Sequence, residues 1–263
     1  MTPLYSTTQP NPTDTYTVSV PQPCPNYVGI IPDGNTRHLK KNPGLQTYQA
    51  GGDKTTEIIN EIGSWVGPSS SEYVKGVVLY GLSSDNKSKR GETVEKVVLE
   101  QVLKQCRLLL RRGCKVGLDG KRERGVRVKF NGDIEGLSDF RLKEEVKEIE
   151  KISNEMSREG GGGGGVEPLD VWVLLNYSGR EAIRRFGGEQ GNPPPFHSGS
   201  SVMPFSLDLI VRSAAEFRLS DFCLYESSYA EFFTVDKLWP DVKREDFRSV
   251  REQWGGRRKR MGS

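Results

Sequence analysis

The sequence lacks a long apolar run, and this absence excludes a membrane-spanning helix. No stretch of about 18 apolar residues occurs, the length at which a segment becomes a candidate membrane span. The first residues also lack the basic and then apolar segments of a secretory signal. We therefore expect a cytoplasmic protein, and the prediction leaves room only for peripheral association with a membrane.

Cysteine and histidine are scarce. The four cysteines form no Cys-x-x-Cys pair and the two histidines stand apart from them, so the sequence predicts neither a zinc site nor a disulfide framework. Phosphate-binding glycine motifs are missing as well, because no GxGxxG follows an apolar run and no GxxxxGK occurs. These absences argue against metal-cage and nucleotide-binding folds.

An excess of charge of one sign is also lacking. The 38 Lys and Arg nearly balance the 35 Asp and Glu, which leaves a net charge of +3. Nucleic-acid-binding domains normally carry a concentrated basic face. We therefore expect no nucleic acid partner.

Hydrophobic residues are few, at 34% of the chain, whereas a globular domain has about 45–50% when glycine is included. Three segments account for the deficit: a Thr-, Pro- and Ser-rich beginning, residues 1–26; six consecutive glycines, residues 160–165; and a Gly-, Pro- and Ser-rich stretch, residues 187–201. The composition predicts a flexible prefix at 1–26, and one domain over 27–263 that contains the other two segments as loops.

Short apolar runs alternate with amphipathic segments from residue 27 onward. The runs predict strands at residues 27–31, 76–80, 126–130, 171–175 and 207–211, and the amphipathic segments predict helices at 53–65, 93–112 and 142–156. This alternation is typical of a single α/β domain whose central, mostly parallel sheet is flanked by helices on both faces. The apolar face of the helix at 93–112 could line a tunnel, although such a face more often packs into the core.

Polar residues directly follow four of these strands. The polar clusters occupy residues 33–37, 83–86, 176–180 and 212–220. Parallel sheets bind ligands beyond the carboxyl ends of their strands. We therefore expect the four clusters to form one site.

Two of the clusters have the chemistry of phosphate binding. Asp33 and Arg37 flank a glycine turn with free N–H groups, which suits a diphosphate held through Mg²⁺. Arg212 and Arg218 bring two guanidinium groups near Ser220, which suits phosphate oxygens. The residues alone leave open an ordinary Asp-Gly turn for the first cluster and a solvated charged surface for the second.

The ordered set of motifs resembles the cis-prenyltransferases, the family of undecaprenyl diphosphate synthase. The resemblance extends from about residue 27 to residue 262, and the matching segments are Ile30-Ile31-Pro32-Asp33-Gly34-Asn35-Thr36-Arg37, Leu79-Tyr80-Gly81-Leu82-Ser83-Ser84-Asp85-Asn86, Asn176-Tyr177-Ser178-Gly179-Arg180, Arg212-Ser213-Ala214-Ala215-Glu216-Phe217-Arg218-Leu219-Ser220-Asp221-Phe222, Tyr229-Ala230-Glu231, Leu238-Trp239-Pro240-Asp241 and Arg260-Met261-Gly262.

The resemblance implies a magnesium-dependent transferase that condenses an allylic prenyl diphosphate with isopentenyl diphosphate in the cis configuration. Asp33 would hold Mg²⁺, with Glu231 near the metal. The allylic diphosphate would be bound by Gly34, Asn35, Arg37 and Gln49, and the diphosphate of isopentenyl diphosphate by Arg212, Arg218 and Ser220. The residues near the reacting carbons would be Ser83 and Asn86. Arg260 and Gly262 resemble a tail that reaches into a partner subunit, which implies a homodimer.

Several positions depart from the family pattern. Pro32 replaces a methionine, Gln49 a histidine, and Ala214 and Ala215 a pair of glycines. No tryptophan follows Asn86, and the segment from 180 to 212 is short, so a helix there is expected to be missing.

These departures leave two other functions open. One is irregular coupling of five-carbon diphosphates, or ionisation and cyclisation of one prenyl diphosphate to a terpene. The other is a non-catalytic subunit of a heteromeric cis-prenyltransferase, which the presence of Asp33 opposes.

Overall fold

A six-stranded sheet forms the centre of the chain, and every strand pairing in it is parallel. The computed structural model describes residues 23–43, 48–69, 72–116, 122–159, 167–186 and 202–257. In spatial order the strands are β5 (Val126–Asn131), β6 (Leu169–Tyr177), β2 (Gly76–Ser83), β1 (Tyr27–Ile31), β7 (Leu209–Ser213) and β8 (Glu231–Val235). A separate antiparallel pair is formed by β3 (Cys114–Val116) and β4 (Arg122–Arg124).

The apolar runs form this sheet because both of its faces are covered. Along β2, Val77 and Leu79 pack into the larger core cluster, whereas Val78 and Tyr80 pack into a smaller cluster on the other face. Side chains alternate between the two faces of a strand, so a run that is apolar at every position fits only a sheet buried on both sides.

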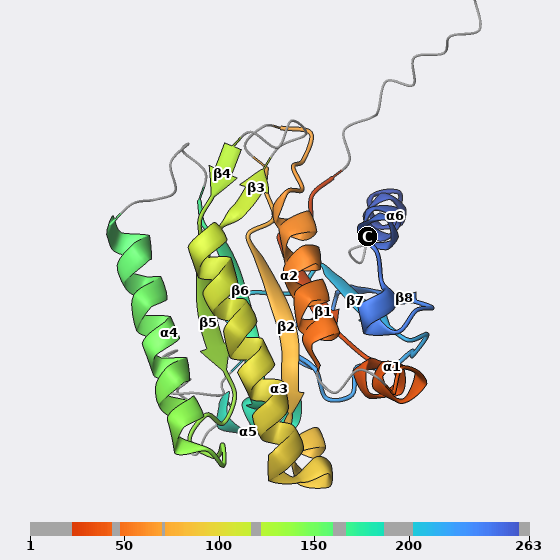
Figure 1. Cartoon of the computed structure of the whole chain (residues 1–263). Coiled ribbons are helices and arrows are strands. Elements are labelled where there is room, and N and C mark those ends of the chain that lie inside the picture. The colour runs from red at the N-terminus through yellow and green to blue at the C-terminus, as the bar shows by residue number, and fades with distance from the viewer. Residues whose placement is uncertain are drawn as a thin grey trace, which may run out of the picture.

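Helices α2 (Gln49–Gly63), α3 (Ser84–Arg112) and α4 (Phe140–Glu159) lie against one face of the sheet (Figure 1). Helix α6 (Arg244–Gly255) contacts α2 and β8, and the short helix α1 (Asn35–Lys41) contacts the 3₁₀ turn η1 (Trp239–Asp241). In the part of the chain that the structure describes, the other face carries one helix, α5 (Gly179–Phe186), and irregular segments around residues 202–208 and 214–230.

The structure confirms the predicted α/β class and its parallel sheet, and it moves several boundaries. Helix α2 starts at Gln49, and β7 ends at Ser213, so Arg212 lies inside the strand. The predicted polar turn at 83–86 is a helix start, because the Ser83 hydroxyl accepts a hydrogen bond from the Asn86 N–H at 3.0 Å. A break at Gly91, where φ is 75°, separates this first part of α3 from the rest.

The loops predicted at 160–165 and 187–201, and most of the predicted prefix, lie outside the described residues. The last residues of that prefix contact the domain: the Asn26 N–H donates to Asp208 at 2.7 Å, and Cys24 Sγ lies 3.6 Å from the Trp65 carbonyl oxygen.

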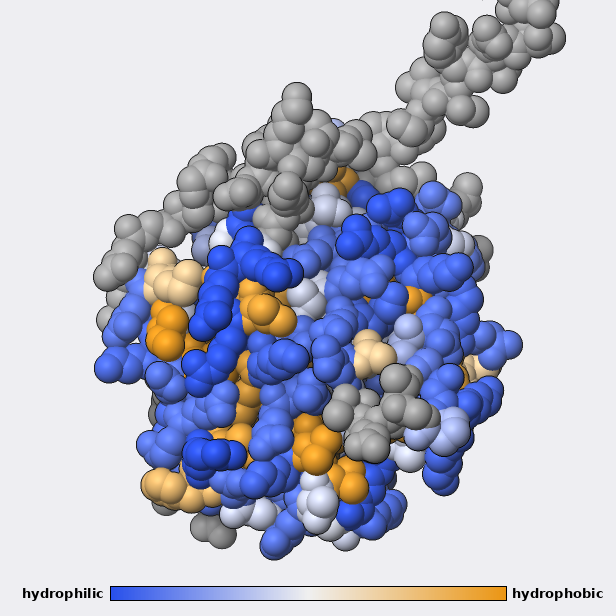
Figure 2. Space-filling model, viewed as in Figure 1, coloured by the Kyte–Doolittle hydropathy of each residue, from blue (hydrophilic) through white to orange (hydrophobic). Residues whose placement is uncertain are grey.

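The face formed by α2, α3 and α4 is mostly hydrophilic, with separate apolar spots (Figure 2). Among the described residues, no helix combines the length and apolarity needed to cross a bilayer.

Candidate active site

The candidate site lies where the connections of the sheet reverse direction. Strands β1 and β7 are neighbours, and Ile31 pairs with Arg212, but the chain continues from β1 toward β2 and from β7 toward β8 on the other side. Such a switch point opens a crevice beyond the carboxyl ends of the two strands. A cavity of about 580 Å³ opens there.

All four predicted polar clusters contribute to the wall of this cavity. The members that line it are Asp33, Gly34, Asn35, Thr36, Arg37, Ser83, Asp85, Asn86, Arg180, Arg212, Arg218 and Ser220. Residues far apart in the sequence therefore meet at one edge of the sheet, as the positions of the clusters after the strands predicted.

An ion pair between Asp33 and Arg212 joins the two predicted diphosphate sites. Arg212 Nη2 lies 2.8 Å from Asp33 Oδ2, and the Arg212 side chain is buried with only 5% of it exposed. Partial burial by itself would raise the pKa of Asp33, but the hydrogen bond and the charge of Arg212, the Gly34 N–H and the charge of Arg37 together hold that pKa below its usual value. The carboxylate is thus kept ionised at neutral pH.

Arg212 also organises the segment that follows β7. Its Nη1 donates to the Ser220 hydroxyl at 2.8 Å and to the Arg218 carbonyl oxygen. One guanidinium group therefore holds both Asp33 and the segment that carries Arg218 and Ser220, which a planar group with several fixed donors can do.

Two other guanidinium groups stand at the mouth of the cavity. Arg37 lies 3.4 Å from Asp33 Oδ1 and 3.7 Å from Glu216, and Arg218 pairs with Glu216. About half of each side chain is exposed, 48% for Arg37 and 57% for Arg218. Their partners are partly exposed, and ion pairs open to solvent are weak, so an arriving phosphate can replace these contacts at small cost.

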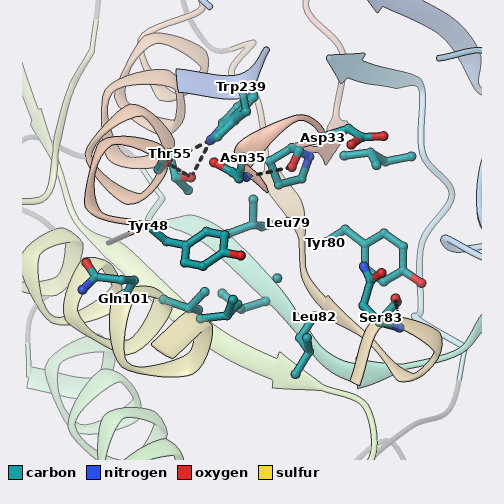
Figure 3. A pocket seen from close by; sticks show the side chains of 18 of the residues that line it. Asp33, Asn35, Tyr48, Thr55, Leu79, Tyr80, Leu82, Ser83, Gln101 and Trp239 are labelled. Carbon is teal, nitrogen blue, oxygen red and sulfur yellow. Dashed lines mark hydrogen bonds between the residues drawn. The ribbon is translucent and has the colours of Figure 1, made fainter. Parts of the chain in front are cut away.

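Asn35 is held against the start of α2. Its Nδ2 donates to the Pro32 carbonyl oxygen at 3.0 Å, and its Oδ1 lies against Gly51, whose carbonyl oxygen accepts from Trp239 Nε1 at 2.9 Å (Figure 3). Thr55 donates to the same carbonyl oxygen at 2.9 Å. Gly51 is therefore close-packed because Asn35 occupies the space that a side chain would need.

Replacing Gly51 with alanine is expected to reduce kcat/KM by about tenfold or more, because the added Cβ would overlap Asn35 Oδ1 and force this side chain from its place. Steady-state kinetics with each of the two predicted diphosphate substrates varied in turn will measure the effect. Gly256→Ala is the control, since its Cβ would meet ordinary contacts of 3.6 and 3.7 Å. Equal activity of the two variants would contradict this packing.

The segment after β7 is conformationally strained. Five of its residues have positive φ without being glycine: Ala214 (69°), Ala215 (55°), Ser220 (52°), Asp221 (67°) and Cys223 (41°). Left-handed backbone costs an L-residue roughly 1–2 kcal/mol. Neither Ala214 nor Ala215 is among the described residues that line the cavity. The methyl groups of these alanines, which stand where the family pattern has glycines, therefore add strain without entering the cavity.

Ala214→Gly and Ala215→Gly are each expected to stabilise the fold by about 0.5–1 kcal/mol, because glycine adopts positive φ without a steric penalty. Urea unfolding will show the gain. The same exchange in a helix, Ala182→Gly in α5, should instead destabilise. A loss of stability at 214 or 215 would show that the strain is absent.

Deeper in the cavity the wall becomes apolar. Helix α3 contributes Val94, Val98 and Val102 to it, and the sheet contributes Val171 and Val173. Other apolar residues of α3, among them Leu99 and Leu103, are fully buried in the core. The apolar face of this helix therefore serves both as core and as cavity wall, the two uses that the sequence left open.

Two predicted site residues lie away from the cavity. Glu231 begins β8 and pairs with Arg257, at the amino edge of the sheet, opposite the edge that carries Asp33. Because a metal bound at Asp33 cannot also reach Glu231 of the same chain, the predicted pair of metal ligands does not form within one copy. Gln49 is exposed at the first residue of α2 and does not line the cavity, and Arg260 and Gly262 lie outside the described residues.

Several residues that line the cavity were not singled out from the sequence. These are Tyr48, Tyr80, Lys89, Arg90 and Trp239. The basic residues carried a signal, because Lys87-Ser88-Lys89-Arg90 directly follows the polar cluster at 83–86. Arg90 reaches across the cavity, and its Nη1 lies 3.3 Å from the Thr36 hydroxyl.

The sequence as a whole places this arrangement in a known family. A family model described as "Putative undecaprenyl diphosphate synthase" matches residues 31–262. The chain belongs to the undecaprenyl diphosphate synthase family. The class of reaction in this family is transfer of prenyl groups, so the chain is a transferase that acts on prenyl groups.

Relatives in the undecaprenyl diphosphate synthase family align over most of their length. The tritrans,polycis-undecaprenyl-diphosphate synthase (geranylgeranyl-diphosphate specific) of Pyrobaculum aerophilum is 29% identical over 256 residues, which covers 90% of this chain and 96% of that one. The isoprenyl transferase of Thermotoga maritima is 28% identical and covers 90% of this chain and 97% of its own. At this identity the chain is a divergent member.

Solved structures show the same fold. Lavandulyl diphosphate synthase from Lavandula x intermedia, in complex with dimethylallyl diphosphate, matches with a TM-score of 0.66 at 22% identity, over 91% of this chain and 98% of that one. A probable undecaprenyl diphosphate synthase from Campylobacter jejuni matches with a TM-score of 0.61 at 20% identity, over 91% and 99%.

Proposed function

We propose that the chain condenses an allylic prenyl diphosphate with isopentenyl diphosphate in the cis configuration and depends on Mg²⁺. The observation that carries this proposal is the pair Asp33–Arg212, which joins two phosphate-binding clusters at the mouth of one partly apolar cavity. The allylic diphosphate would bind at the cluster of residues 33–37, and isopentenyl diphosphate at the cluster of residues 212–220. With their hydrocarbon groups directed into the cavity, the two substrates would have their reacting carbons close together.

The side chains of this site suit the ionisation of an allylic diphosphate. When the allylic carbon–oxygen bond breaks, the diphosphate leaves with the electron pair, and its growing charge is stabilised by cations and N–H groups that are already in place. Arg37, Arg90 and the turn at Gly34 supply these groups around Asp33. The double bond of isopentenyl diphosphate then forms the new carbon–carbon bond, a proton is lost, and the apolar wall excludes water from the cationic carbon.

The residues present fit a magnesium ion that the substrate helps to hold. Mg²⁺ is usually bound by one or two carboxylates together with substrate phosphates. Asp33 offers an ionised carboxylate at the cavity, and among the described residues no cluster of three His, Cys, Asp or Glu forms a larger cage. When bound there, Mg²⁺ would neutralise charge on the leaving diphosphate.

The homodimer is part of the proposal. Glu231 lies at the opposite edge of the sheet from Asp33 in one copy, so it could approach a metal at Asp33 only from a second copy. The predicted role of Arg260 and Gly262 also requires a second copy.

The function will be tested with purified protein, farnesyl or geranyl diphosphate, isopentenyl diphosphate and Mg²⁺. The expected products are longer prenyl diphosphates with new cis double bonds, identified by chromatography and NMR. Failure of the chain to lengthen would overturn the proposal. A hydrocarbon or branched product from one allylic substrate alone would replace it with the irregular chemistry that the edited motifs left open.

A further inference from the structure

Two tyrosines line the cavity, and each contacts one of the two segments that carry the predicted diphosphate-binding residues. Tyr80 is in β2 and Tyr48 directly precedes α2, and Figure 3 shows their rings on either side of Leu79. Each hydroxyl contacts a segment to which the proposed function assigns a different substrate. The two hydroxyl groups therefore make contacts that ring packing alone would not provide.

The Tyr80 hydroxyl holds the segment that carries Arg218 and Ser220. It donates to the Ser220 carbonyl oxygen at 3.2 Å, and the more distant Tyr177 carbonyl oxygen lies at 3.5 Å. The side chain is almost fully buried, and its ring packs 5.2 Å from that of Phe222. Phenylalanine would keep this packing and remove only the contacts of the hydroxyl group, which include one with the Ser83 side chain.

The backbone held by Tyr80 would relax if it were released. Ser220 and Asp221 have φ of 52° and 67°, a conformation that persists in such residues only when surrounding contacts enforce it. The Ser220 hydroxyl accepts from Arg212, and its carbonyl oxygen accepts from Tyr80. Asp221 is held separately, because its carbonyl oxygen and its carboxylate accept from the N–H groups of Gly179 and Arg180. Loss of the Tyr80 bond would remove one of the two ties on Ser220.

The Tyr48 hydroxyl makes the corresponding contact on the other side. It lies 3.2 Å from the Thr36 hydroxyl, within the turn that carries Asp33 and Arg37. Thr36 also accepts a hydrogen bond from Arg90 at 3.3 Å, so this turn keeps a second tie when the Tyr48 hydroxyl is removed.

We propose that Tyr80 and Tyr48 are positioning residues for different substrates: Tyr80 sets the affinity for isopentenyl diphosphate through Ser220, and Tyr48 sets the affinity for the allylic diphosphate through Thr36. The inference rests on the proposed function, which assigns the substrates to the two segments. Neither phenol needs to touch a diphosphate.

Tyr80→Phe and Tyr48→Phe are matched variants, and each serves as the control for the other. Isothermal titration calorimetry with Mg²⁺ will measure binding of isopentenyl diphosphate and, separately, of a non-ionising thiolodiphosphate analogue of the allylic substrate. For Tyr80→Phe we expect the Kd of isopentenyl diphosphate to rise about fivefold to tenfold, with the other Kd within twofold. For Tyr48→Phe we expect a rise of about twofold to fivefold in the Kd of the analogue alone.

Steady-state KM values for both substrates and thermal unfolding complete the test. A merely structural role predicts a lower Tm and an equal change in both Kd values. If the wild type binds both compounds, either that result or unchanged Kd values in both variants would overturn the inference. If the wild type binds neither compound, the proposed function fails together with the inference. If the wild type binds both compounds but does not lengthen the prenyl chain, only the proposed condensation fails. The different effects of the two variants on the two Kd values still decide the roles of the tyrosines.

Discussion

Asp33→Asn is expected to lower kcat/KM on the order of 10³-fold while leaving the fold intact. The amide keeps the size of the carboxylate but cannot neutralise Arg212, which lies 2.8 Å away, or offer an anionic ligand to Mg²⁺. Because Asp33 pairs with the buried Arg212 and so joins the two phosphate clusters, its charge affects both substrates. Steady-state kinetics over a range of Mg²⁺ concentrations will measure the loss.

Asp236→Asn is the matched control, because Asp236 is exposed and does not line the cavity. It should retain wild-type kinetics. Circular dichroism and thermal unfolding must show that Asp33→Asn is folded. Turnover by folded Asp33→Asn near the wild-type rate would remove Asp33 from the proposed chemistry.

The meeting of Asp33 with Arg212 could be predicted because both follow or end an apolar run. In a parallel sheet the carboxyl ends of all strands share one edge, so polar residues that come after a strand converge whatever their distance along the chain. The same reasoning explains why Glu231, predicted to lie near the metal, is far from Asp33 in the same chain. Glu231 precedes its apolar run, and as the first residue of β8 it lies at the amino edge.

The tyrosines could not be predicted in the same way. Tyr80 belongs to a run in which every residue is apolar or aromatic, and a residue in such a run does not reveal which face of the sheet it occupies. In the structure β2 pairs irregularly with β6 directly after Tyr80, and the consecutive residues 79–82 all line the cavity. Tyr48 directly precedes α2, and no local sequence pattern marks its place at the cavity.

Helix α6 is a different case, since its signal was present in the sequence. Phe247, Val250 and Trp254 recur at helical spacing, and all three are buried against the sheet and α2. The strand β8 is short, and tertiary pairing with β7 rather than composition fixes its ends. The core of the α/β fold was thus predictable and the spacing in α6 was visible in the sequence, whereas the ends of the last strand depend on the neighbouring strand.

Arg212→Met is expected to reduce kcat/KM by 10²–10³-fold or more, with Arg212→Lys between it and the wild type. Lysine keeps the charge, but a single ammonium group cannot reach Asp33, the Ser220 hydroxyl and the Arg218 carbonyl oxygen together, as the guanidinium does. Kinetics with isopentenyl diphosphate varied should show the ordered loss. Equal activity of the lysine variant and the wild type would contradict the need for the planar fork.

The free energy of unfolding measures the Asp33–Arg212 ion pair independently of catalysis. Arg212→Met leaves a partly buried carboxylate without its partner and is expected to cost about 2–3 kcal/mol in the free energy of unfolding. The exposed pair of Arg244 with Glu57 offers a control, since Arg244→Met should cost less than about 1 kcal/mol. Because Asp33→Asn removes the charge that Arg212→Met would strand, the double variant should be more stable than the sum of the single losses implies. Strict additivity in urea unfolding would mean that Asp33 and Arg212 do not interact in solution, and the link between the two diphosphate sites would then have to be made by the substrates alone.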